Sequence, residues 1–351
     1  MKARLALLPG DGIGPEVVHQ ARLALVAVAR RFSHEFEVEE HPIGGAALDA
    51  GGKPLPSRTM RACRAADAIL LGAVGGPQWA QSVRGEQPED GLFGLRVGLG
   101  LFANLRPVSA NPHIMDACPL KRERVEGADI LVVRELLGGL YAGQKRLETT
   151  PEGLLATDSS SYLECEIDRV ARIAFREATK RRGRVTSVDK ANALETSRLW
   201  RRVVTRVGEE HTDVVLEHQL VDSCALRLVS EPRSFDVILT ENMFGDILSD
   251  EAAVIVGSLG MLPSASIGES SRGLYEPVHG SAPELAGRGV ANPIGTILSA
   301  ALLLRHSLGL HAEAAALEQA VEGCLRDGVK TRDLGGSQST QTVGAAIIAR
   351  L

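Results

Sequence analysis

The chain has 351 residues, with 39 basic and 44 acidic side chains and a formal net charge of -5. This balance excludes the general electrostatic attraction of a basic protein to nucleic acid or to acidic membranes. Five scattered cysteines without a C-x-x-C pair argue against a disulfide framework and against a zinc site. Because the start does not resemble a signal peptide and no apolar run reaches about 18 residues, we expect a soluble cytoplasmic protein, and its length favours two lobes.

Apolar runs rich in β-branched residues alternate with amphipathic helical patterns along the chain. Strands are predicted at 3–8, 36–44, 66–75, 128–136, 184–190 and 235–242, and helices at 15–31, before 66, at 166–183 and at 194–211. Such alternation is typical of an α/β fold with a substantially parallel sheet.

The first predicted strand ends in the stretch LPGDGIGPEV, which contains Gly10, Gly12 and Gly14. A dinucleotide-binding Rossmann fingerprint requires G-x-G-x-x-G, and no such spacing can be aligned here. Pro15 and Glu16 suit the first turn of a helix. The residues themselves therefore predict a tight strand-turn-helix and not a Rossmann site.

Two glycine-rich passages, 91–100 and 257–268, are candidate crossings between the lobes. They predict a discontinuous first domain of residues 1–101 and 258–351, with residues 102–257 as the second. The polar, aperiodic segment 141–162 is either an exposed arm or a subunit contact, and the sequence favours neither.

Asp246 and Asp250 are four residues apart in NMFGDILSD and therefore share one helix face. Like charges at this spacing repel each other on a solvated helix. A solvated acidic face of the helix is nevertheless the alternative interpretation of this pair. The flanking residues are apolar, however, and a partly buried carboxylate pair suits a hard divalent cation. Asp222, from a neighbouring element, is a candidate third ligand.

Three arginines, Arg96, Arg106 and Arg134, are expected at strand or loop ends. Together their guanidinium groups match a substrate with two carboxylates, although each alone is more typical of a surface residue. Lys190, at the end of a strand, is a candidate base, and Tyr141, after a glycine pair, is a candidate acid.

The segment LYEPVHGSAPELAGRGVANP combines glycines, prolines and short polar residues with His279, Glu284 and Asn292. A loop of this composition can surround an adenine nucleotide. An acidic side chain at 284 would accept hydrogen bonds from ribose hydroxyls and repel a 2′-phosphate, which favours NAD over NADP. An ordinary structured loop is the alternative.

Taken in order, these segments resemble the β-decarboxylating dehydrogenases of 3-isopropylmalate, isocitrate, homoisocitrate and tartrate. The resemblance covers essentially residues 1 to 350 and is carried by LPGDGIGPEV, GGPQW, LFANLRP, VRELLGGLY, SVDKAN, NMFGDILSD, GSLGMLPSAS and EPVHGSAP. The first, second and third of these look most like the 3-isopropylmalate branch. The resemblance implies the two-lobed isopropylmalate/isocitrate dehydrogenase-like α/β fold, with a discontinuous first domain, which is not Rossmann.

The resemblance also implies a reaction: NAD-dependent oxidative decarboxylation of 3-isopropylmalate to 2-oxoisocaproate, in leucine biosynthesis. In that case Arg96, Arg106 and Arg134 clamp the carboxylates, and Tyr141 protonates carbon. Asp246 and Asp250 bind Mg²⁺ or Mn²⁺ together with Asp222 of the partner subunit, which also touches the substrate, and Lys190 of the partner subunit removes the hydroxyl proton. The implied protein is therefore an obligate homodimer with shared active sites.

Further residues are implied in recognition. Those facing the group on C3 of the substrate are Glu89, Leu92, Phe93 and Ala193. Those holding the nucleotide are Ile13, Glu276, His279, Gly280, Ser281, Ala282, Glu284 and Asn292.

The chain departs from the family pattern at four positions. Phe93 and Ala193 stand where a second leucine and a valine are usual, so one wall of the substrate pocket is larger and the other smaller. This leaves a bulkier substrate such as 3-benzylmalate as an alternative. Ala142 replaces a phenylalanine, and Glu284 replaces the commoner aspartate.

Two other functions are compatible with parts of this pattern. Isocitrate and homoisocitrate dehydrogenases must accommodate a third carboxylate, which the apolar Leu92 and Phe93 disfavour. A non-catalytic relative would be expected to lack a metal ligand, the tyrosine or the lysine, and all of them are present in this sequence.

Overall fold

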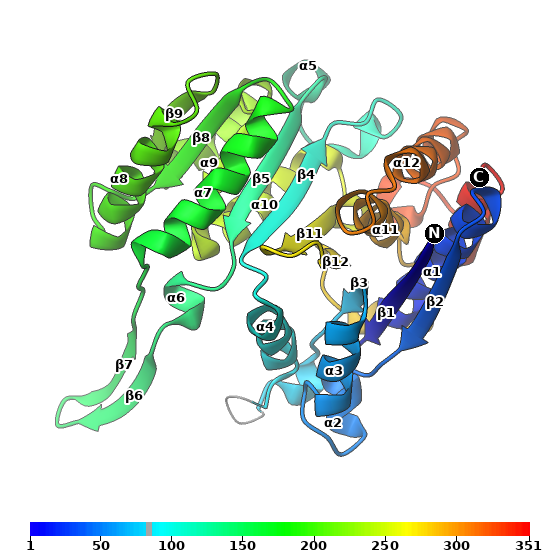
Figure 1. Cartoon of the computed structure of the whole chain (residues 1–351), viewed down its shortest axis with the longest axis horizontal. Coiled ribbons are helices and arrows are strands. Elements are labelled where there is room, and N and C mark those ends of the chain that lie inside the picture. Colours follow the sequence, from blue (N-terminus) through cyan, green and yellow to red (C-terminus); the bar gives the residue numbers. More distant parts are fainter. Residues whose placement is uncertain (82–85) are drawn as a thin grey trace. The chain divides into compact units, whose positions relative to one another are not determined.

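The computed structural model describes residues 1–81 and 86–351 (Figure 1). The chain forms two compact units. Unit 1 comprises Met1–Leu101, Asn111–Pro119 and Val256–Leu351, and unit 2 comprises Phe102–Ala110 and Leu120–Ile255. Both ends of the chain thus belong to unit 1.

In unit 1 the strands run in the order β2-β1-β3-β12-β11. All neighbours are parallel except β11 and β12, which are antiparallel. The strands are β1 (Lys2–Gly10), β2 (Glu35–Glu40), β3 (Ala68–Ala73), β11 (Pro263–Ile267) and β12 (Leu274–Pro277). The helices are α1 (Gly14–Arg31), α2 (Gly45–Asp49), α3 (Ser57–Ala65), α4 (Pro88–Leu99), α11 (Ile294–His306), α12 (His311–Arg326) and α13 (Thr340–Ile348).

Helix α1 packs its apolar face into the core of unit 1. Its apolar residues recur at helical spacing, and Val17, Ala21 and Val28 are completely buried. Every residue of β3 is buried, as expected for a parallel strand covered on both faces.

In unit 2 the strands run in the order β4-β5-β10-β8-β9, with β4 antiparallel to β5 and the others parallel. They are β4 (Ala103–Ser109), β5 (Asp129–Glu135), β8 (Arg184–Asp189), β9 (Val215–Leu220) and β10 (Val237–Thr240). The helices are α5 (Arg122–Val125), α6 (Gly139–Ala142), α7 (Glu164–Thr179), α8 (Glu195–Glu209), α9 (Val221–Ser230) and α10 (Asn242–Val256).

The segment that sequence alone left open, 141–162, contains an antiparallel hairpin of β6 (Lys145–Thr150) and β7 (Gly153–Asp158). The hairpin forms a separate two-stranded sheet that projects from α6 and α7 (Figure 1). Leu147 and Leu154 are 68% and 74% exposed. The segment is therefore an arm whose apolar side chains are exposed in a single copy of the chain.

The predicted alternation of strands and helices is confirmed, with shifts at some boundaries. The strand expected at 36–44 ends at Glu40, and the strand expected at 235–242 covers only Val237–Thr240. The second difference arises because helix α10 begins at Asn242. Among the described residues, no helix combines the length and the apolar character that crossing a bilayer requires.

The turn after β1 ties the first strand to a distant loop. Gly12 has a φ of +56°, and the backbone N–H of Ile13 donates to the carbonyl oxygen of Ser281 at 2.8 Å. A Cβ atom on Gly12 would lie 1.9 Å from that same oxygen. The glycine is therefore required both by conformation and by the close approach of the two backbones.

Gly51 provides a matched control, because its φ is +75° and a Cβ there would meet nothing within 4 Å. A left-handed conformation costs a non-glycine residue about 1 kcal/mol or more. We expect Gly51→Ala to lower the free energy of unfolding by about that amount, and Gly12→Ala to lower it by at least about twice as much, measured by urea denaturation. Equal losses would show that the contact with Ser281 does not matter.

Candidate active site

Two neighbouring strands of unit 2 present polar side chains on one face. Asn104 on β4 lies directly opposite Arg134 on β5, and Arg106 follows Asn104 by two residues. Opposite residues of an antiparallel pair, and residues two apart on one strand, share a face. The Arg106 and Arg134 side chains are 8% and 5% exposed, so both guanidinium groups are withdrawn from solvent.

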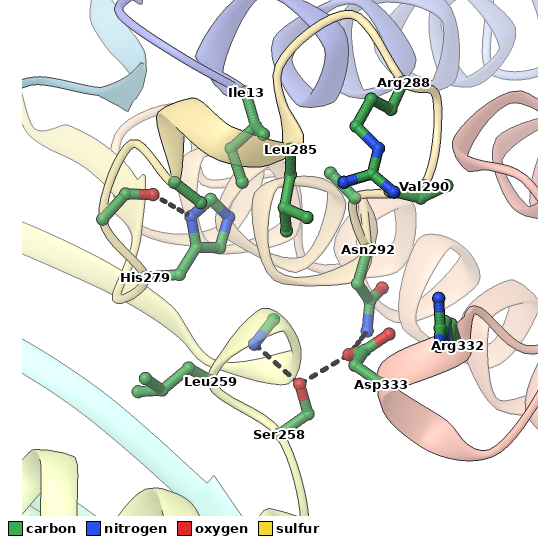
Figure 2. Close-up of a pocket in the computed structure, with 14 residues that line it drawn as sticks. Ile13, Ser258, Leu259, His279, Leu285, Arg288, Val290, Asn292, Arg332 and Asp333 are labelled. Carbon is green, nitrogen blue, oxygen red and sulfur yellow. Dashed lines mark hydrogen bonds between the residues drawn. The ribbon is translucent and has the colours of Figure 1, made fainter. Parts of the chain in front are cut away.

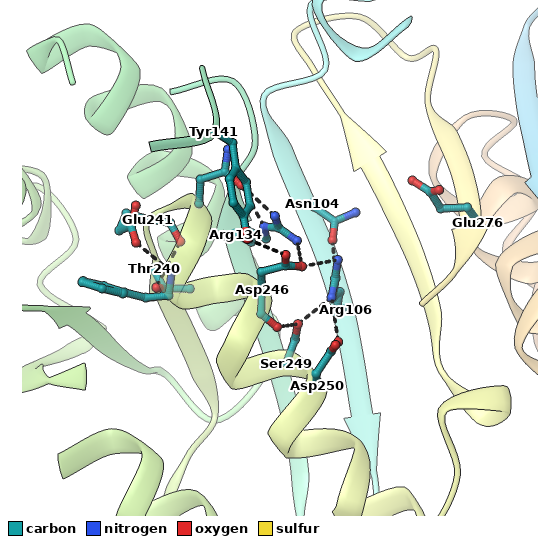
Figure 3. Close-up of polar contacts among 12 residues, drawn as sticks. Asn104, Arg106, Arg134, Tyr141, Thr240, Glu241, Asp246, Ser249, Asp250 and Glu276 are labelled. Atoms are coloured by element: carbon teal, nitrogen blue, oxygen red, sulfur yellow. Dashed lines mark hydrogen bonds and ion pairs between the residues drawn. The ribbon is translucent and has the colours of Figure 1, made fainter. Parts of the chain in front are cut away.

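Helix α10 brings two carboxylates to these arginines (Figure 3). Asp246 accepts a hydrogen bond from Arg134 Nη1, and its Oδ1 lies 3.6 Å from Arg106 Nη2. Asp250, one turn further along, has Oδ1 at 3.6 Å from Arg106 Nη1. The start of the helix is fixed by Glu241, whose Oε1 accepts from the backbone N–H of Phe244 at 2.7 Å.

The surroundings of Asp246 and Asp250 shift the pKa values of the two carboxyl groups in opposite directions. Burial alone would raise the pKa of Asp246, but the charges of Arg134 and Arg106 outweigh it and hold that pKa below its ordinary value. Burial raises the pKa of Asp250, and Arg106 offsets this only in part. Asp246 is therefore the more strongly acidic of the pair.

Tyr141 lies beside Asp246. It belongs to α6, a short helix that begins at Gly139, whose φ is +74°. Its hydroxyl donates to Asp246 Oδ2 at 2.9 Å, and the Arg134 guanidinium lies 5.7 Å from the centre of its ring. Burial, followed by the negative charge of Asp246, raises the pKa of Tyr141. The phenol therefore stays protonated at neutral pH and is suited to donate a proton.

Lys190 and Asp222 form a second, separate pair. Lys190 directly follows β8, Asp222 lies in the first turn of α9, and Lys190 Nζ donates to Asp222 Oδ1 at 2.6 Å. This bond lowers the pKa of Asp222. Within one copy of the chain, the described residues contain no group of three acidic, histidine or cysteine side chains able to hold a metal ion, so Asp222 does not join Asp246 and Asp250.

Asp246 and Asp250 nevertheless fit a hard divalent cation. Both supply carboxylate oxygens, which Mg²⁺ and Mn²⁺ prefer, and the Asp250 side chain is 60% exposed. Two carboxylates leave room for further oxygen ligands, from water, a substrate or another chain.

Unit 1 contains a cavity of about 540 Å³ (Figure 2). Its lining is drawn from the turn after β1, the segment before β11, the loop after β12 and the segment before α13. The lining residues are Ile13, Ser258, Leu259, Gly260, His279, Gly280, Ala282, Leu285, Arg288, Val290, Ala291, Asn292, Arg332 and Asp333.

The cavity offers polar groups for a nucleotide. The His279 Nδ1 atom contacts the Gly280 carbonyl at 2.9 Å, while its buried Nε2 has no hydrogen-bond partner among residues 1–81 and 86–351. Burial lowers the pKa of His279, which favours the neutral ring. Asn292 Nδ2 donates to Asp333 Oδ2 at 2.9 Å, and Ser258 Oγ donates to the same oxygen at 2.5 Å. An orphaned ring nitrogen in a preformed cavity fits a ligand that hydrogen-bonds, such as a dinucleotide.

Three residues expected at the nucleotide do not line this cavity, namely Glu276, Ser281 and Glu284. Ser281 instead binds Ile13 through its backbone carbonyl, and Glu284 is exposed. Glu276 is buried and accepts from Arg96 Nη2 at 2.7 Å.

Helix α4 carries Arg96 together with three of the four expected substrate-recognition residues, Glu89, Leu92 and Phe93. Arg96 lies in its last turn, not at the strand or loop end expected from the sequence. Leu92 packs on the hydrophobic core of unit 1, Phe93 is half-buried, and Glu89 is exposed. Ala193 belongs to unit 2, where its N–H donates to the Lys190 carbonyl at 2.9 Å.

Sequence reasoning missed several residues of these two sites. Asn104 could have been found, because strand periodicity puts it on the face of Arg106. Ser249, which accepts from Arg106 Nη1 at 2.5 Å, lies three residues after Asp246 on the same helix. Asp333 gave no signal, because it reaches the cavity from a segment remote in sequence.

Comparisons with known proteins agree with this geometry. Residues 4–347 match the model of the isocitrate/isopropylmalate dehydrogenase family. The 3-isopropylmalate dehydrogenase of Anaeromyxobacter dehalogenans is 55% identical, with 100% of each chain covered. That of Bacillus subtilis is also 55% identical, over 100% of this chain and 98% of its own.

Solved structures show the same fold. The isocitrate dehydrogenase of Methylococcus capsulatus has a TM-score of 0.88 and 32% identity, covering 99% of both chains. A β-decarboxylating dehydrogenase of Thermococcus kodakarensis has a TM-score of 0.80 and 36% identity, covering 99% of this chain and 96% of its own. The two-lobed α/β fold expected from the resemblance is thus confirmed, and it is not a Rossmann fold.

Membership of this family implies a small-molecule substrate, a dinucleotide and a divalent metal ion. The chain is an enzyme, a β-decarboxylating dehydrogenase, and it belongs to the isocitrate/isopropylmalate dehydrogenase family.

Proposed function

We propose that this enzyme catalyses the oxidative decarboxylation of 3-isopropylmalate to 2-oxoisocaproate, a step of leucine biosynthesis, using NAD and Mg²⁺ or Mn²⁺. The observation that carries the proposal is the cluster in unit 2, where the buried Arg106 and Arg134 meet Asp246, Asp250 and Tyr141. The names of relatives that are 55% identical over the full length support the choice of substrate.

The substrate has two carboxylates, and three guanidinium groups are proposed to bind them. Arg106 and Arg134 are held rigidly on β4 and β5, which suits bidentate recognition of carboxylates. Arg96 is paired with Glu276 in this structure, so binding a substrate carboxylate would require Arg96 to share or exchange that partner.

The reaction requires two proton transfers by the protein. The C2 hydroxyl loses a proton and C2 loses a hydride, the carboxylate on C3 leaves as CO₂, and C3 then takes a proton. Lys190 is proposed to assist loss of the hydroxyl proton, with Asp222 as its hydrogen-bond partner. Tyr141 is proposed to donate the proton to C3, and its raised pKa keeps that proton available.

Asp246 and Asp250, with Asp222 of a second copy, are proposed to hold the metal ion. When bound, the ion supplies a Lewis acid that stabilises negative charge on the substrate oxygen, and the dinucleotide supplies the hydride acceptor. The residues proposed to hold NAD line the cavity of unit 1, and they are Ile13, His279, Gly280, Ala282 and Asn292. Glu284 supports NAD over NADP by its charge, whereas Arg288 and Arg332 would each tolerate an added phosphate.

A homodimer with shared sites is part of the proposal. Asp222 and Lys190 form a pair apart from Asp246 and Asp250, so the described part of one copy brings no three such ligands together. Unit 2 also exposes apolar side chains on its arm and helices, which suits a covered interface. They are Leu147, Leu154, Leu155, Leu226, Val229 and Ile247.

The substrate and cofactors are tested by steady-state kinetics on a panel of 3-substituted malates. We expect NADH and CO₂ formation from 3-isopropylmalate with Mg²⁺ or Mn²⁺, and loss of activity on chelation. The kcat/KM for 3-isopropylmalate should exceed that for 3-benzylmalate and isocitrate. A preference for 3-benzylmalate would move the assignment to a specialised substrate, and better use of NADP than NAD would overturn the cofactor.

Shared active sites are tested by mixing two inactive variants. In a mixed dimer of Lys190→Ala and Tyr141→Phe chains, one site combines an intact tyrosine with an intact lysine. We therefore expect the mixture to regain activity that neither parent shows. If each site were built from a single chain, every site in the mixed dimer would be defective and no activity would return.

A further inference from the structure

Two buried asparagines contact the arginines of unit 2 through their amide oxygens. Asn104 and Asn242 are 0% and 1% exposed. Asn104 lies on β4, two residues before Arg106, and Asn242 is the first residue of α10. Neither is among the residues assigned above to substrate, metal or dinucleotide.

Asn242 accepts two hydrogen bonds from one edge of the Arg134 guanidinium group. Its Oδ1 accepts from Arg134 Nε at 3.1 Å and from Nη2 at 2.8 Å. Its Nδ2 donates to the Gly138 carbonyl at 3.1 Å. Because a carbonyl can only accept, this bond requires the amide nitrogen to face Gly138 and the amide oxygen to face Arg134.

Asn104 likewise accepts a hydrogen bond from Arg106. Its Oδ1 accepts from Arg106 Nε at 2.7 Å, and Ser249 Oγ accepts from Nη1 at 2.5 Å. Ser249 in turn donates to the Asp246 carbonyl at 3.0 Å, which orients its hydroxyl oxygen toward the arginine. Each arginine is therefore oriented in part by neutral oxygen acceptors.

Neutral acceptors leave the charge of the cluster unchanged. Two guanidinium groups face two carboxylates, Asp246 and Asp250, so these four side chains sum to zero. A divalent cation and a dicarboxylate together also sum to zero. A carboxylate in place of either asparagine would add one negative charge to these four side chains, at a position that is withdrawn from water and where an added charge is costly.

We propose that Asn104 and Asn242 are positioning residues that orient Arg106 and Arg134 without neutralising them, so that the arginine charge acts on the substrate's carboxylates. This inference rests on the proposed function, because it takes the ligand to be a dicarboxylate bound with a divalent ion.

The test uses substitutions of nearly equal shape, Asn242→Asp and Asn104→Asp, in the full-length enzyme. Each retains an oxygen acceptor for its arginine and adds one negative charge. We expect the KM for 3-isopropylmalate to rise about 10- to 100-fold, the range expected for a perturbed hydrogen bond to a charged group. The KM for NAD should change less than about twofold, because unit 1 is untouched.

Direct binding of Mn²⁺, followed without turnover, separates a charge effect from damage to the fold. An added negative charge should leave Mn²⁺ affinity unchanged or increase it, whereas a disordered site would weaken both ligands. Gln319→Glu, which adds the same charge at an exposed position of helix α12 in unit 1, is the control and should leave both KM values unchanged.

Two results would overturn the inference. One is an unchanged KM for 3-isopropylmalate in Asn104→Asp and Asn242→Asp. The other is a parallel loss of substrate and Mn²⁺ binding, which would mark the asparagines as merely structural. Should Asn242→Asp fail to fold, since its second oxygen faces the Gly138 carbonyl, Asn104→Asp decides alone. Failure of the proposed function is distinguishable, because the unaltered enzyme would then not turn over any malate in the panel.

Discussion

The contact on which the candidate site depends is the position of Asp246 between the guanidinium groups of Arg106 and Arg134. Two arginines buried on adjacent strands would be strongly unfavourable without opposite charge nearby. Helix α10 supplies that charge, and it can do so because it begins immediately after β10, which pairs with β5. The side chains that would bind a charged ligand, Arg106, Arg134 and Asp246, therefore also attach helix α10 to strands β4 and β5.

This arrangement also explains why groups of similar chemistry differ in behaviour. Asp246, contacted by both arginines, has a depressed pKa, whereas burial gives Asp250, whose Oδ1 lies 3.6 Å from Arg106 Nη1, a raised one. Tyr141 is kept protonated by burial and by the same Asp246 charge. The charges and burial of one cluster therefore give it a protonated phenol on Tyr141, a strongly acidic carboxyl on Asp246 and a less acidic one on Asp250.

The parts of the site that depend on spacing within one helix or strand could be predicted from the sequence. The four-residue spacing of Asp246 and Asp250 required a shared helix face, and helix α10 has that geometry. The pairing of Asn104 with Arg134 could not be predicted, because no tight turn joins these two antiparallel strands and fixes their register. Arg96 was expected at a strand or loop end, yet lies in a helix, because the pattern of GLFGLRVG is compatible with either.

The loop after β12 shows the same limit. Its composition indicated a nucleotide-binding loop, and His279 and Asn292 do line a cavity. Composition does not determine side-chain direction, however, and Glu284 lies outside the lining while Ser258 and Asp333 complete it from remote segments. Contacts set by tertiary packing were therefore the ones that sequence patterns missed.

The most direct measurement of the central idea is calorimetric titration of Mn²⁺ into the unaltered enzyme and into Asp250→Asn, each at several pH values. Because burial raises the pKa of Asp250, that carboxyl takes up a proton before Asp246 does as the pH falls. Mn²⁺ affinity of the unaltered enzyme should therefore decline on acidification, and Asp250→Asn should bind at least about tenfold more weakly at neutral pH. Equal Mn²⁺ affinity in the two proteins would contradict the assignment of this cluster as the metal site.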